Sequence, residues 1–386
     1  MNDLLFLSTF PPRQCGIATF TDDVVRSVEQ QAPHIAGSVI AVHDSSGPPC
    51  LYPRRVAAKL EQHERAAYRE AAAFINNHPA PVLNIQHEFG IFGGPYGVWL
   101  LDLLQQVKKP VALTLHTVLP SPTFEHRKLV RDLCERAARV IVLSETGRRF
   151  LATQYFIDAQ YIEVIPHGVP DVPFVPTAQA KRALDLDGRF VVSTFGLLSR
   201  GKGLELALDA IAGVAKVYPE VLYVILGATH PNIRQVEGEA YRTALQARID
   251  RMGLSRNVLM VNRYLALEDL IQYILATDVY VTPYVNEAQI VSGTLAYAVG
   301  AGKPVVSTPY FYARELLEDG RGMTVPFNDA VAMTRSLVAL ATDEQMCGEM
   351  AARAYAFGRS MIWSEVGGRY ARLFEQLAAR AQTIFA

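Results

Sequence analysis

Short apolar runs, separated by longer stretches with helical spacing, recur along this chain of 386 residues. Most of the runs are continuous, and continuous apolar runs are typical of parallel strands covered on both faces. In the first half they lie at 4–10, 38–44, 81–89, 110–117, 139–145 and 161–168. In the second half they lie at 189–196, 221–228, 257–265, 278–284, 303–308 and 322–327. Because strand and helix signals alternate in each half, the pattern predicts two doubly wound, Rossmann-like α/β domains.

The stretches between the runs have the periodicity of covering helices. EHRKLVRDLCERAAR (125–139) places Leu129, Leu133 and Ala137 on one face and charged residues elsewhere. The last helical run, EVGGRYARLFEQLAARAQTIFA, begins at Glu365 and is expected to pack on one of the two domains, with a return to the amino-terminal domain as one option.

A proline-rich stretch, GVPDVPFVPTAQAKRALDLDG (168–188), interrupts the pattern near the middle of the chain. Three prolines follow Gly168 and no clear period is present, which is typical of an interdomain linker. The predicted segments are an amino-terminal domain over 1–175, a linker over 176–188, a carboxy-terminal domain over 189–364 and a closing helix over 365–386.

Composition narrows the class of protein. Lysine and arginine number 37 against 38 for aspartate and glutamate, so the net charge of -1 gives no reason to expect a nucleic-acid partner. The four cysteines lack metal-ligand spacing, and we expect reduced thiols in a cytoplasmic protein. The chain starts with an acidic residue where a signal peptide has basic ones, and no apolar run approaches the roughly 20 residues that span a bilayer. We expect a soluble protein; the sequence leaves peripheral membrane contact and oligomeric state open.

Ligands of open parallel sheets gather at the carboxyl ends of the strands, so the residues after each run are the first candidates for chemistry. STFGLLSRGKGLELALDAI places Gly196, Arg200 and Lys202 between a strand and a helix. Glycines let backbone amides approach a ligand, and a helix start with adjacent cations favours phosphate. The spacing fits neither a Walker sequence nor a dinucleotide fingerprint. A basic turn that caps a strand explains the stretch equally well when it is taken alone.

A second candidate is NEAQIVSGTLAYAVGAGKPVVST (286–308). Ser292 and Thr294 are candidate N-cap residues of a helix, and Gly293 offers backbone to a ligand. Glu287 precedes this helix by a short loop, although a lone loop glutamate is usually only solvated. Two such sets of strand ends, one from each domain, are expected to face each other across a central cleft.

His116 ends the run PVALTLHT and is the best polar candidate of the first domain. The alternative is a histidine whose ring is satisfied by backbone at a strand end, and His87, Glu88 and His230 share this ambiguity. DLD, at 185–187, is interpreted as a turn before a glycine and a strand. We therefore predict neither a metal site nor a cofactor.

These stretches, in their order and spacing, resemble a family 4 retaining glycosyltransferase with the GT-B fold. The more specific matches are FGLLSRGKG, VLYVILGA, NVLMVNRY, ATDVYVTPYVNEAQ and AVGAGKPVVST, all from the second domain. VIPHGVP is similar to the family's hinge-side IPNGV, and MIWSEVGGRYARLFEQL is similar to its closing Trp-helix segment. The resemblance covers nearly the whole chain.

The resemblance implies an amino-terminal domain that binds the acceptor and a carboxy-terminal domain that holds an activated sugar. It also implies that no metal is bound, because side chains and a helix dipole neutralise the leaving group. Lys202 matches the lysine that contacts the donor phosphates, and Glu287 matches the acid that hydrogen-bonds sugar hydroxyls. His116 matches the histidine near the transferred sugar, and Gly16 lies in the loop that approaches the phosphates.

Two positions depart from the family pattern. The second acid, which holds the nucleotide ribose eight positions after the first, is here Leu295. A leucine cannot accept ribose hydroxyls, so a backbone group or Arg263 is left to serve the nucleotide. The family's arginine directly after the glycine is here Leu197, which leaves Arg200 as its substitute.

Three hypotheses for the function result. The leading one is metal-independent, retaining transfer of a hexosyl unit from a nucleotide-sugar to a hydroxyl acceptor, either a glycan or a small glycoside. Lys202, Arg200 and the amides near Ser292, Gly293 and Thr294 stabilise the departing phosphate. The second is phosphorylase-like chemistry with a sugar 1-phosphate in the same fold, which the missing ribose carboxylate motivates. The third is a noncatalytic sugar- or nucleotide-binding protein.

Overall fold

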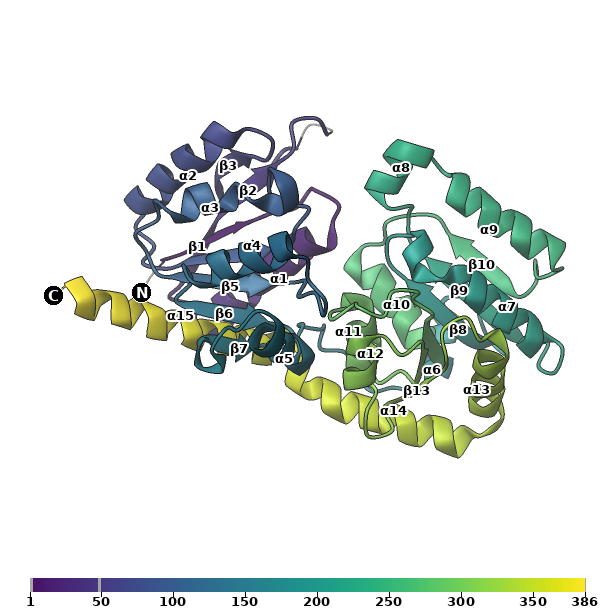
Figure 1. The fold of residues 1–386 in the computed structure, drawn as a ribbon. Helices are drawn as coiled ribbons and strands as arrows, with labels where there is room; N and C mark the ends of the chain where they lie inside the picture. Colours follow the sequence, from purple (N-terminus) through teal and green to yellow (C-terminus); the bar gives the residue numbers. More distant parts are fainter. Residues whose placement is uncertain (1–2, 48–49, 386) are drawn as a thin grey trace. The chain divides into compact units, whose positions relative to one another are not determined.

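The computed structural model describes residues 3–47 and 50–385, and these form two compact units (Figure 1). Unit 1 consists of the described residues up to Gly168 together with those from Trp363 onward, and unit 2 is Val169–Ile362. Each unit contains its own parallel sheet with helices on both faces. The prediction of two doubly wound α/β domains is therefore confirmed.

The sheet of unit 1 has the strand order β3-β2-β1-β4-β5-β6-β7, and all of its neighbouring strands are parallel. Its strands are β1 (Asp3–Ser8), β2 (Ala36–His43), β3 (Val56–Glu61), β4 (Leu83–His87), β5 (Val111–Leu115), β6 (Arg139–Val142) and β7 (Ile162–Val164). Its helices are α1 (Gly16–Gln31), α2 (Arg65–Asn77), α3 (Leu100–Leu104), α4 (Phe124–Cys134), α5 (Glu145–Gln154) and α15 (Trp363–Phe385). The strand order reverses between β1 and β4.

The sheet of unit 2 has the order β10-β9-β8-β11-β12-β13 and is also parallel throughout. Its strands are β8 (Phe190–Phe195), β9 (Val221–Leu226), β10 (Val258–Val261), β11 (Val279–Thr282), β12 (Val305–Ser307) and β13 (Gly322–Thr324). Its helices are α6 (Thr177–Ala183), α7 (Leu204–Ala215), α8 (Pro231–Glu237), α9 (Ala240–Arg251), α10 (Leu267–Ala276), α11 (Gly293–Gly300), α12 (Phe311–Leu316), α13 (Ala330–Thr342) and α14 (Glu344–Gly358). The strand order reverses between β8 and β11.

The apolar runs in the middle of each sheet are strands buried on both faces, as predicted, whereas the edge strands β7, β10 and β13 are only partly buried. Successive residues of β8 show this, because Val191 packs in one core cluster of unit 2 and Val192 packs in another. The first cluster includes residues of α10, α11 and α12, and the second includes residues of α7, α9 and α13. Helices thus cover both faces of the sheet.

Strand β3 was not predicted from the sequence. Its residues alternate between partly buried and exposed until the buried Leu60, so VAAKLE has no continuous apolar run. It lies at the edge of the sheet and pairs only with β2 among the described strands. An edge strand is covered less completely than a central one, and its sequence therefore carries a weaker signal.

The segments differ from the predicted ones at two places. The change from unit 1 to unit 2 falls between Gly168 and Val169, not within 176–188. Residues 177–183 of the predicted linker form α6, and Ala180 and Leu186 pack in the core of unit 2. Their few apolar positions are enough to attach a short helix to a sheet, although they are too few to give a visible period.

Helix α4 also ends earlier than its periodicity suggests. Leu129 and Leu133 are buried on its inner face, whereas Ala137 lies beyond its last residue, Cys134. The closing helix α15 lies along unit 1 (Figure 1) and packs against α1. Gly367 permits this approach, because a Cβ atom there would lie 2.5 Å from the carbonyl oxygen of Ser27. Within the described part of the chain, no helix combines the length and the apolar character needed to cross a membrane.

Candidate active site

The carboxyl ends of β8 and β11 lie side by side where the strand order of unit 2 reverses. Helices leave neighbouring strands toward opposite faces at such a point, which opens a crevice that ligands of α/β sheets commonly occupy. Gly196 follows β8 directly, and Tyr284 follows β11 after Pro283. The loop after β11 then leads into α11.

Lys202 is held at this edge by a tight 3₁₀ turn, η3 (Arg200–Lys202). Its Nζ donates a hydrogen bond of 2.5 Å to the Tyr284 hydroxyl and lies 4.4 Å from the centre of the Tyr284 ring. Gly203 ends the turn in a left-handed conformation with φ of 63°. A Cβ atom there would lie 1.9 Å from the Pro283 carbonyl oxygen, so only glycine lets the turn lie against the loop after β11.

A chain of hydroxyl groups connects Lys202 to the start of α11. Tyr284 Oη lies 2.8 Å from Thr294 Oγ1, which lies 3.2 Å from Ser292 Oγ. Ser292 Oγ accepts a hydrogen bond from the Leu295 amide and is the N-cap of the helix. Gly196 lies against the same side chains, because a Cβ atom there would lie 3.1 Å from the Thr294 methyl and 3.4 Å from Lys202 Nζ. The structure therefore brings Gly196, Lys202, Ser292 and Thr294 together.

This arrangement has the chemistry of an anion site. The first intrahelical hydrogen bond of α11 runs from the Ala296 amide to the Ser292 carbonyl at 3.0 Å. The amides of Gly293 and Thr294 therefore have no acceptor in their own helix, and they carry the positive end of its dipole. An ammonium group, hydroxyls and amide donors converge within one short segment, which is the combination that phosphate oxygens require.

Tyr284 is buried, and the adjacent Lys202 ammonium acts on the pKa of its phenol. Burial acts to raise the pKa of the phenol, but the adjacent ammonium and the hydrogen bonds of Lys202, Thr294 and Ser292 outweigh it. The pKa of Tyr284 is consequently below its ordinary value. Burial raises the pKa of the neighbouring Tyr310, whose ring stacks on that of Tyr284 at 5.1 Å between centres.

Glu287 lies on the loop between β11 and α11 and is half exposed. Its carboxylate accepts a hydrogen bond of 2.5 Å from Arg314 of α12, and its carbonyl accepts one from the Phe311 amide. The loop is therefore fixed at both the side chain and the backbone. An exposed carboxylate in this position is accessible to the hydroxyl groups of a ligand.

The two predicted arginines have partners away from this group. Arg200 donates to Glu237 of α8 at 3.0 Å, and its guanidinium lies over the Tyr241 ring. Arg263 is exposed and pairs with Asp269 at 3.1 Å. Arg200 therefore does not replace the missing arginine in this conformation, because its side chain turns toward α8 and α9 while Lys202 turns toward β11.

Leu295 and Leu197 behave differently although both replace family polar residues. Leu295 is fully buried and belongs to the core of unit 2 together with Tyr284 and Tyr310. It therefore contributes apolar packing to α11 and presents no polar group to a ligand. Leu197 is only partly buried, on the segment between Gly196 and η3.

In unit 1, His116 is buried directly after β5. Its Nε2 donates to Gln86 Oε1 at 2.8 Å, and the Phe20 ring packs edge to face against it at 4.8 Å. The Gln86 amide donates in turn to Asn84 Oδ1, and the Asn84 amide donates to the Ala112 carbonyl. A backbone carbonyl can only accept a hydrogen bond, so the Asn84 amide donates to it, the Gln86 amide donates to Asn84, and His116 Nε2 donates to Gln86. The lone pair of the neutral His116 ring therefore lies on Nδ1.

Burial, with smaller effects from His167 and His87, lowers the pKa of His116 to about 3. The imidazole is therefore neutral at physiological pH and is an oriented polar group, not a cation. Gly16, the other candidate of unit 1, is exposed at the first position of α1 after the N-cap Cys15. A Cβ atom at Gly16 would have no heavy atom within 4 Å, so the backbone there faces open space.

Two family models match this chain. One is described as Glycosyltransferase Family 4 and matches residues 39–171, and the other is described as Glycosyl transferases group 1 and matches residues 189–343. Between them they reach both units and include the Lys202, Tyr284 and Glu287 region. The chain belongs to family 4 of the glycosyltransferases. It is an enzyme of this class with the GT-B fold.

Individual relatives of this glycosyltransferase agree with that assignment. The phosphatidyl-myo-inositol mannosyltransferase of Mycobacterium leprae is 25% identical over 284 residues, which are 73% of this chain and 71% of the relative. Sucrose-phosphate synthase of Thermosynechococcus elongatus superposes with a TM-score of 0.79 at 17% identity, covering 98% of this chain and 100% of that chain. HepE of Anabaena, in complex with UDP and glucose, superposes with a TM-score of 0.76 at 17% identity, covering 97% and 100%. These two structures show the shared fold.

Two of the side-chain arrangements described above, one in each unit, were not predicted from the sequence of this glycosyltransferase. Tyr284 lies in the quoted stretch ATDVYVTPYVNEAQ, and the only signal was a tyrosine placed next to a proline at a strand end. Asn84 and Gln86 gave a better signal, because they are amides inside an otherwise apolar run. The role of each of these residues depends on a hydrogen-bond partner from another segment, which the local sequence does not reveal.

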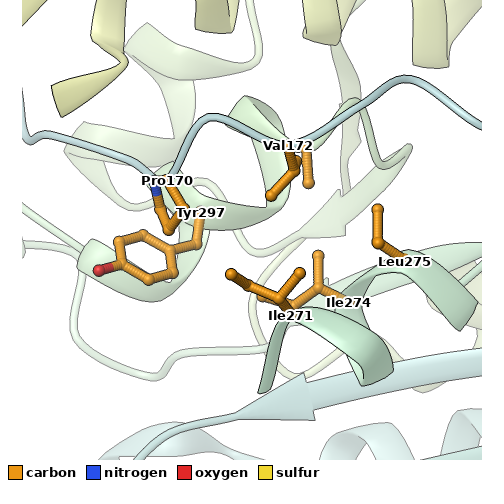
Figure 2. Close-up of a pocket in the computed structure, with 7 residues that line it drawn as sticks. Pro170, Val172, Ile271, Ile274, Leu275 and Tyr297 are labelled. Carbon is orange, nitrogen blue, oxygen red and sulfur yellow. The ribbon is translucent and has the colours of Figure 1, made fainter. Parts of the chain in front are cut away.

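A small apolar pocket of unit 2 lies apart from these residues (Figure 2). Its lining includes Pro170, Val172, Ile271, Ile274, Leu275 and Tyr297. Its volume is about 10 Å³, enough for about one water molecule. It cannot hold a sugar of the glycosyltransferase reaction, and in Figure 2 the Tyr297 hydroxyl is directed away from the aliphatic side chains. Among the residues that the structure describes, no group of three or more His, Cys, Asp or Glu side chains is arranged to hold a metal ion.

Proposed function

We propose that this glycosyltransferase transfers a hexosyl unit from a nucleotide-sugar to a hydroxyl acceptor with retention of anomeric configuration and without a metal ion. The acceptor is a glycan or a small glycoside. The observation that carries the proposal is the position of Lys202 beside the amino terminus of α11, at the point where the strand order of unit 2 reverses. Cation, amides and hydroxyls together bind a diphosphate and neutralise it as it leaves.

In the proposed reaction, the bond between the anomeric carbon and the donor phosphate oxygen breaks, and a bond to the acceptor oxygen forms on the same face. The acceptor proton passes to the departing phosphate oxygen. Lys202 and the amides of Gly293 and Thr294 stabilise the negative charge that develops on the phosphate. Glu287 hydrogen-bonds hydroxyls of the transferred sugar, and the hydrogen bond from the Phe311 amide to its carbonyl holds its loop in the orientation that makes positioning effective.

Unit 1 supplies the acceptor side in this proposal. His116 acts as a neutral, oriented group near the transferred sugar, because the Asn84–Gln86 series holds its ring and burial disfavours a second ring proton. Gly16 offers unobstructed backbone at the start of α1 as the proposed contact of this unit with a ligand phosphate. A side chain at that position would occupy the space that the ligand needs.

The relatives direct the choice of donor. The mycobacterial relatives are named mannosyltransferases, and HepE has been crystallised with UDP-glucose. We therefore expect a mannosyl or glucosyl donor. A thermal-shift screen of UDP-, GDP- and ADP-sugars against sugar 1-phosphates tests this, because a ligand that binds the native state raises its apparent stability. Stabilisation by one class of nucleotide-sugar, followed by an α-linked product from an α-linked donor in NMR spectra, is the expected result.

Substitution of the two charged residues tests the site. Lys202→Ala and Glu287→Ala should each lower kcat/KM at least about 100-fold, as loss of a charged transition-state contact does. Stability should change by less than about 1 kcal/mol for Glu287→Ala, because its ion pair with Arg314 is half exposed. Initial rates and denaturation midpoints measure the two quantities.

Arg314→Ala is the matched control, because it breaks the same ion pair and leaves the carboxylate in place. It should retain most of the activity. A loss equal to that of Glu287→Ala would mean that the pair merely shapes the loop. Wild-type rates in Lys202→Ala would refute the donor site as proposed.

A second candidate, sugar 1-phosphate chemistry, is favoured by one observation. Leu295 is fully buried in the core, so the position that holds a ribose in the family offers none of its atoms to a ribose here. Phosphate and sugar contacts need no ribose. Incubation of the enzyme with oligosaccharides and inorganic phosphate should release sugar 1-phosphate if this candidate is correct. Absence of release across a broad panel, together with transfer from a nucleotide-sugar, would reject it.

A further inference from the structure

The Tyr284 phenol is the hydrogen-bond acceptor that the Lys202 ammonium uses within the described structure. A lysine side chain has four rotatable bonds and loses considerable conformational entropy when it is held in one place. The contact with Tyr284 fixes the ammonium before any ligand arrives. Only one of the three ammonium protons is used, so two remain for phosphate oxygens.

Tyr284 is itself held rigidly. Its side chain is buried, its ring stacks on Tyr310 with 16° between the planes, and its hydroxyl contacts Thr294. Its backbone carbonyl accepts a hydrogen bond of 2.6 Å from the Thr308 hydroxyl, which follows β12. The loop between β12 and α12 therefore holds the ring and the backbone, and α11 holds the hydroxyl, so the phenol oxygen has little freedom to move.

The contact also joins the two halves of the anion site. Lys202 comes from the turn after β8, whereas Ser292, Gly293 and Thr294 come from the start of α11. Tyr284 follows β11 and makes hydrogen-bond contacts with both Lys202 and Thr294. Without its hydroxyl, no hydrogen bond that the structure describes connects the ammonium to α11.

We propose that Tyr284 is a positioning residue for the donor phosphates: its hydroxyl, anchored on Thr294, holds Lys202 Nζ beside the amino terminus of α11. The inference rests on the proposed function, because it takes Lys202 as the phosphate-binding cation. The Tyr284 side chain holds that cation in place before the donor binds. It forms no covalent bond with a substrate and transfers no proton in the reaction. The phenol acts through Lys202.

The electrostatics of the phenol support this assignment. Apart from Lys202, the groups around its oxygen are the uncharged hydroxyls of Ser292 and Thr294. The nearby titratable groups are Tyr223, Tyr280 and Tyr310, whose pKa values are raised by burial, and His230, which lies near Lys202. Lys202 is therefore the source of the positive potential that lowers the pKa of Tyr284 against its burial. Removal of the ammonium should raise that pKa.

The contact is tested first without reference to activity, by titration of tyrosinate absorbance. In the wild-type protein, one tyrosine should titrate below the ordinary range of tyrosine. This titration should vanish in Tyr284→Phe, move upward in Lys202→Met and persist in Tyr310→Phe, the control that removes a neighbouring buried phenol. An unchanged titration in Lys202→Met would overturn the proposal, even if Tyr284→Phe failed to fold.

The functional consequence is tested by kinetics and calorimetry with UDP, GDP and ADP as probes. Tyr284→Phe should weaken binding of the preferred nucleotide and lower kcat/KM for the donor by about tenfold, the effect of one hydrogen bond to a charged group. The acceptor KM should stay unchanged, and Tyr310→Phe should behave as wild type. Wild-type donor kinetics in Tyr284→Phe would overturn the inference.

The outcomes separate the two proposals. Activity lost in Lys202→Ala but retained fully in Tyr284→Phe leaves the donor site intact and rejects Tyr284 as its positioning residue. Activity retained in Lys202→Ala rejects the proposed function itself. Tyr284→Phe with reduced kcat/KM, combined with a shifted titration in Lys202→Met, supports both.

Discussion

Lys202 and Arg200 are two residues apart on one short turn, yet the structure gives their cations different partners. Lys202 donates to Tyr284 after β11, and Arg200 donates to Glu237 of α8. Sequence reasoning grouped them, because both lie in a basic, glycine-containing loop. The direction of each side chain depends on elements that are distant in the chain. The presence of two cations in this loop was therefore predictable from the sequence, whereas the partner of each cation was not.

Gly16 gives a test at the scale of a single residue. Gly16→Ala should leave stability unchanged or raise it by less than about 1 kcal/mol, because the new methyl meets no neighbour and alanine favours a helix. The same variant should lower kcat/KM for the donor, since the methyl fills the space in front of α1. Thermal unfolding and initial rates measure the two effects. Full activity in a stable variant would remove Gly16 from the site.

At the scale of elements, the turn η3 is shaped by the glycines on either side of Lys202. Gly203 adopts a left-handed conformation against the Pro283 carbonyl, whereas a Cβ atom at Gly201 would meet only Ser199 Oγ, at 3.9 Å. The close approach of η3 to the loop after β11 therefore depends on one of these two glycines. It also brings Lys202 within reach of Tyr284.

The pair Gly203→Ala and Gly201→Ala tests this element directly. Gly203→Ala should destabilise unit 2 by about 1 to 3 kcal/mol and reduce donor turnover, because the turn must move away from Pro283. Gly201→Ala should change both quantities little. Denaturant unfolding and donor kinetics provide the measurements. Equal effects of the two substitutions would contradict the account of the turn.

At the scale of the whole molecule, unit 1 contains the buried histidines His87 and His116 and the partly buried His167, and removal of these side chains from solvent depresses their pKa values. The pKa is about 3 for His116 and about 4 for His87 and His167. The ordinary value is 6.5, so the unfolded chain binds more protons than the native one between these values. Stability is therefore fully present above about pH 6.5 and falls as the pH drops toward 4.

Substitution of His87 tests this pH dependence most directly. Neither of its ring nitrogens has a hydrogen-bond partner among the described residues, and its ring packs edge to face against Phe89 and stacks on Phe92. His87→Phe should stay within about 1 kcal/mol of wild type at pH 7 and become more stable than it by roughly 1 to 2 kcal/mol at pH 5. Both tryptophans, Trp99 and Trp363, lie in unit 1, so their fluorescence reports the unfolding of this unit.

The exposed His63 provides the control for that measurement. His63→Gln should retain the acid sensitivity of the wild-type protein. If His87→Phe loses stability between pH 7 and pH 5 as steeply as wild type does, its buried imidazole does not contribute to the acid sensitivity of unit 1.

The sequence by itself determined the fold class and most strands, because a strand buried on both faces is apolar at most positions. It also determined which strand ends carry cations, glycines and hydroxyls. It missed β3, whose edge position relaxes that requirement, and it placed the boundary between the units too late, because α6 joins unit 2 through few apolar contacts. Tertiary structure alone decided that Lys202 meets Tyr284, that Arg200 turns to α8 and that Leu295 enters the core. Each of these depends on which residues from distant segments share a face, and local sequence does not encode that proximity.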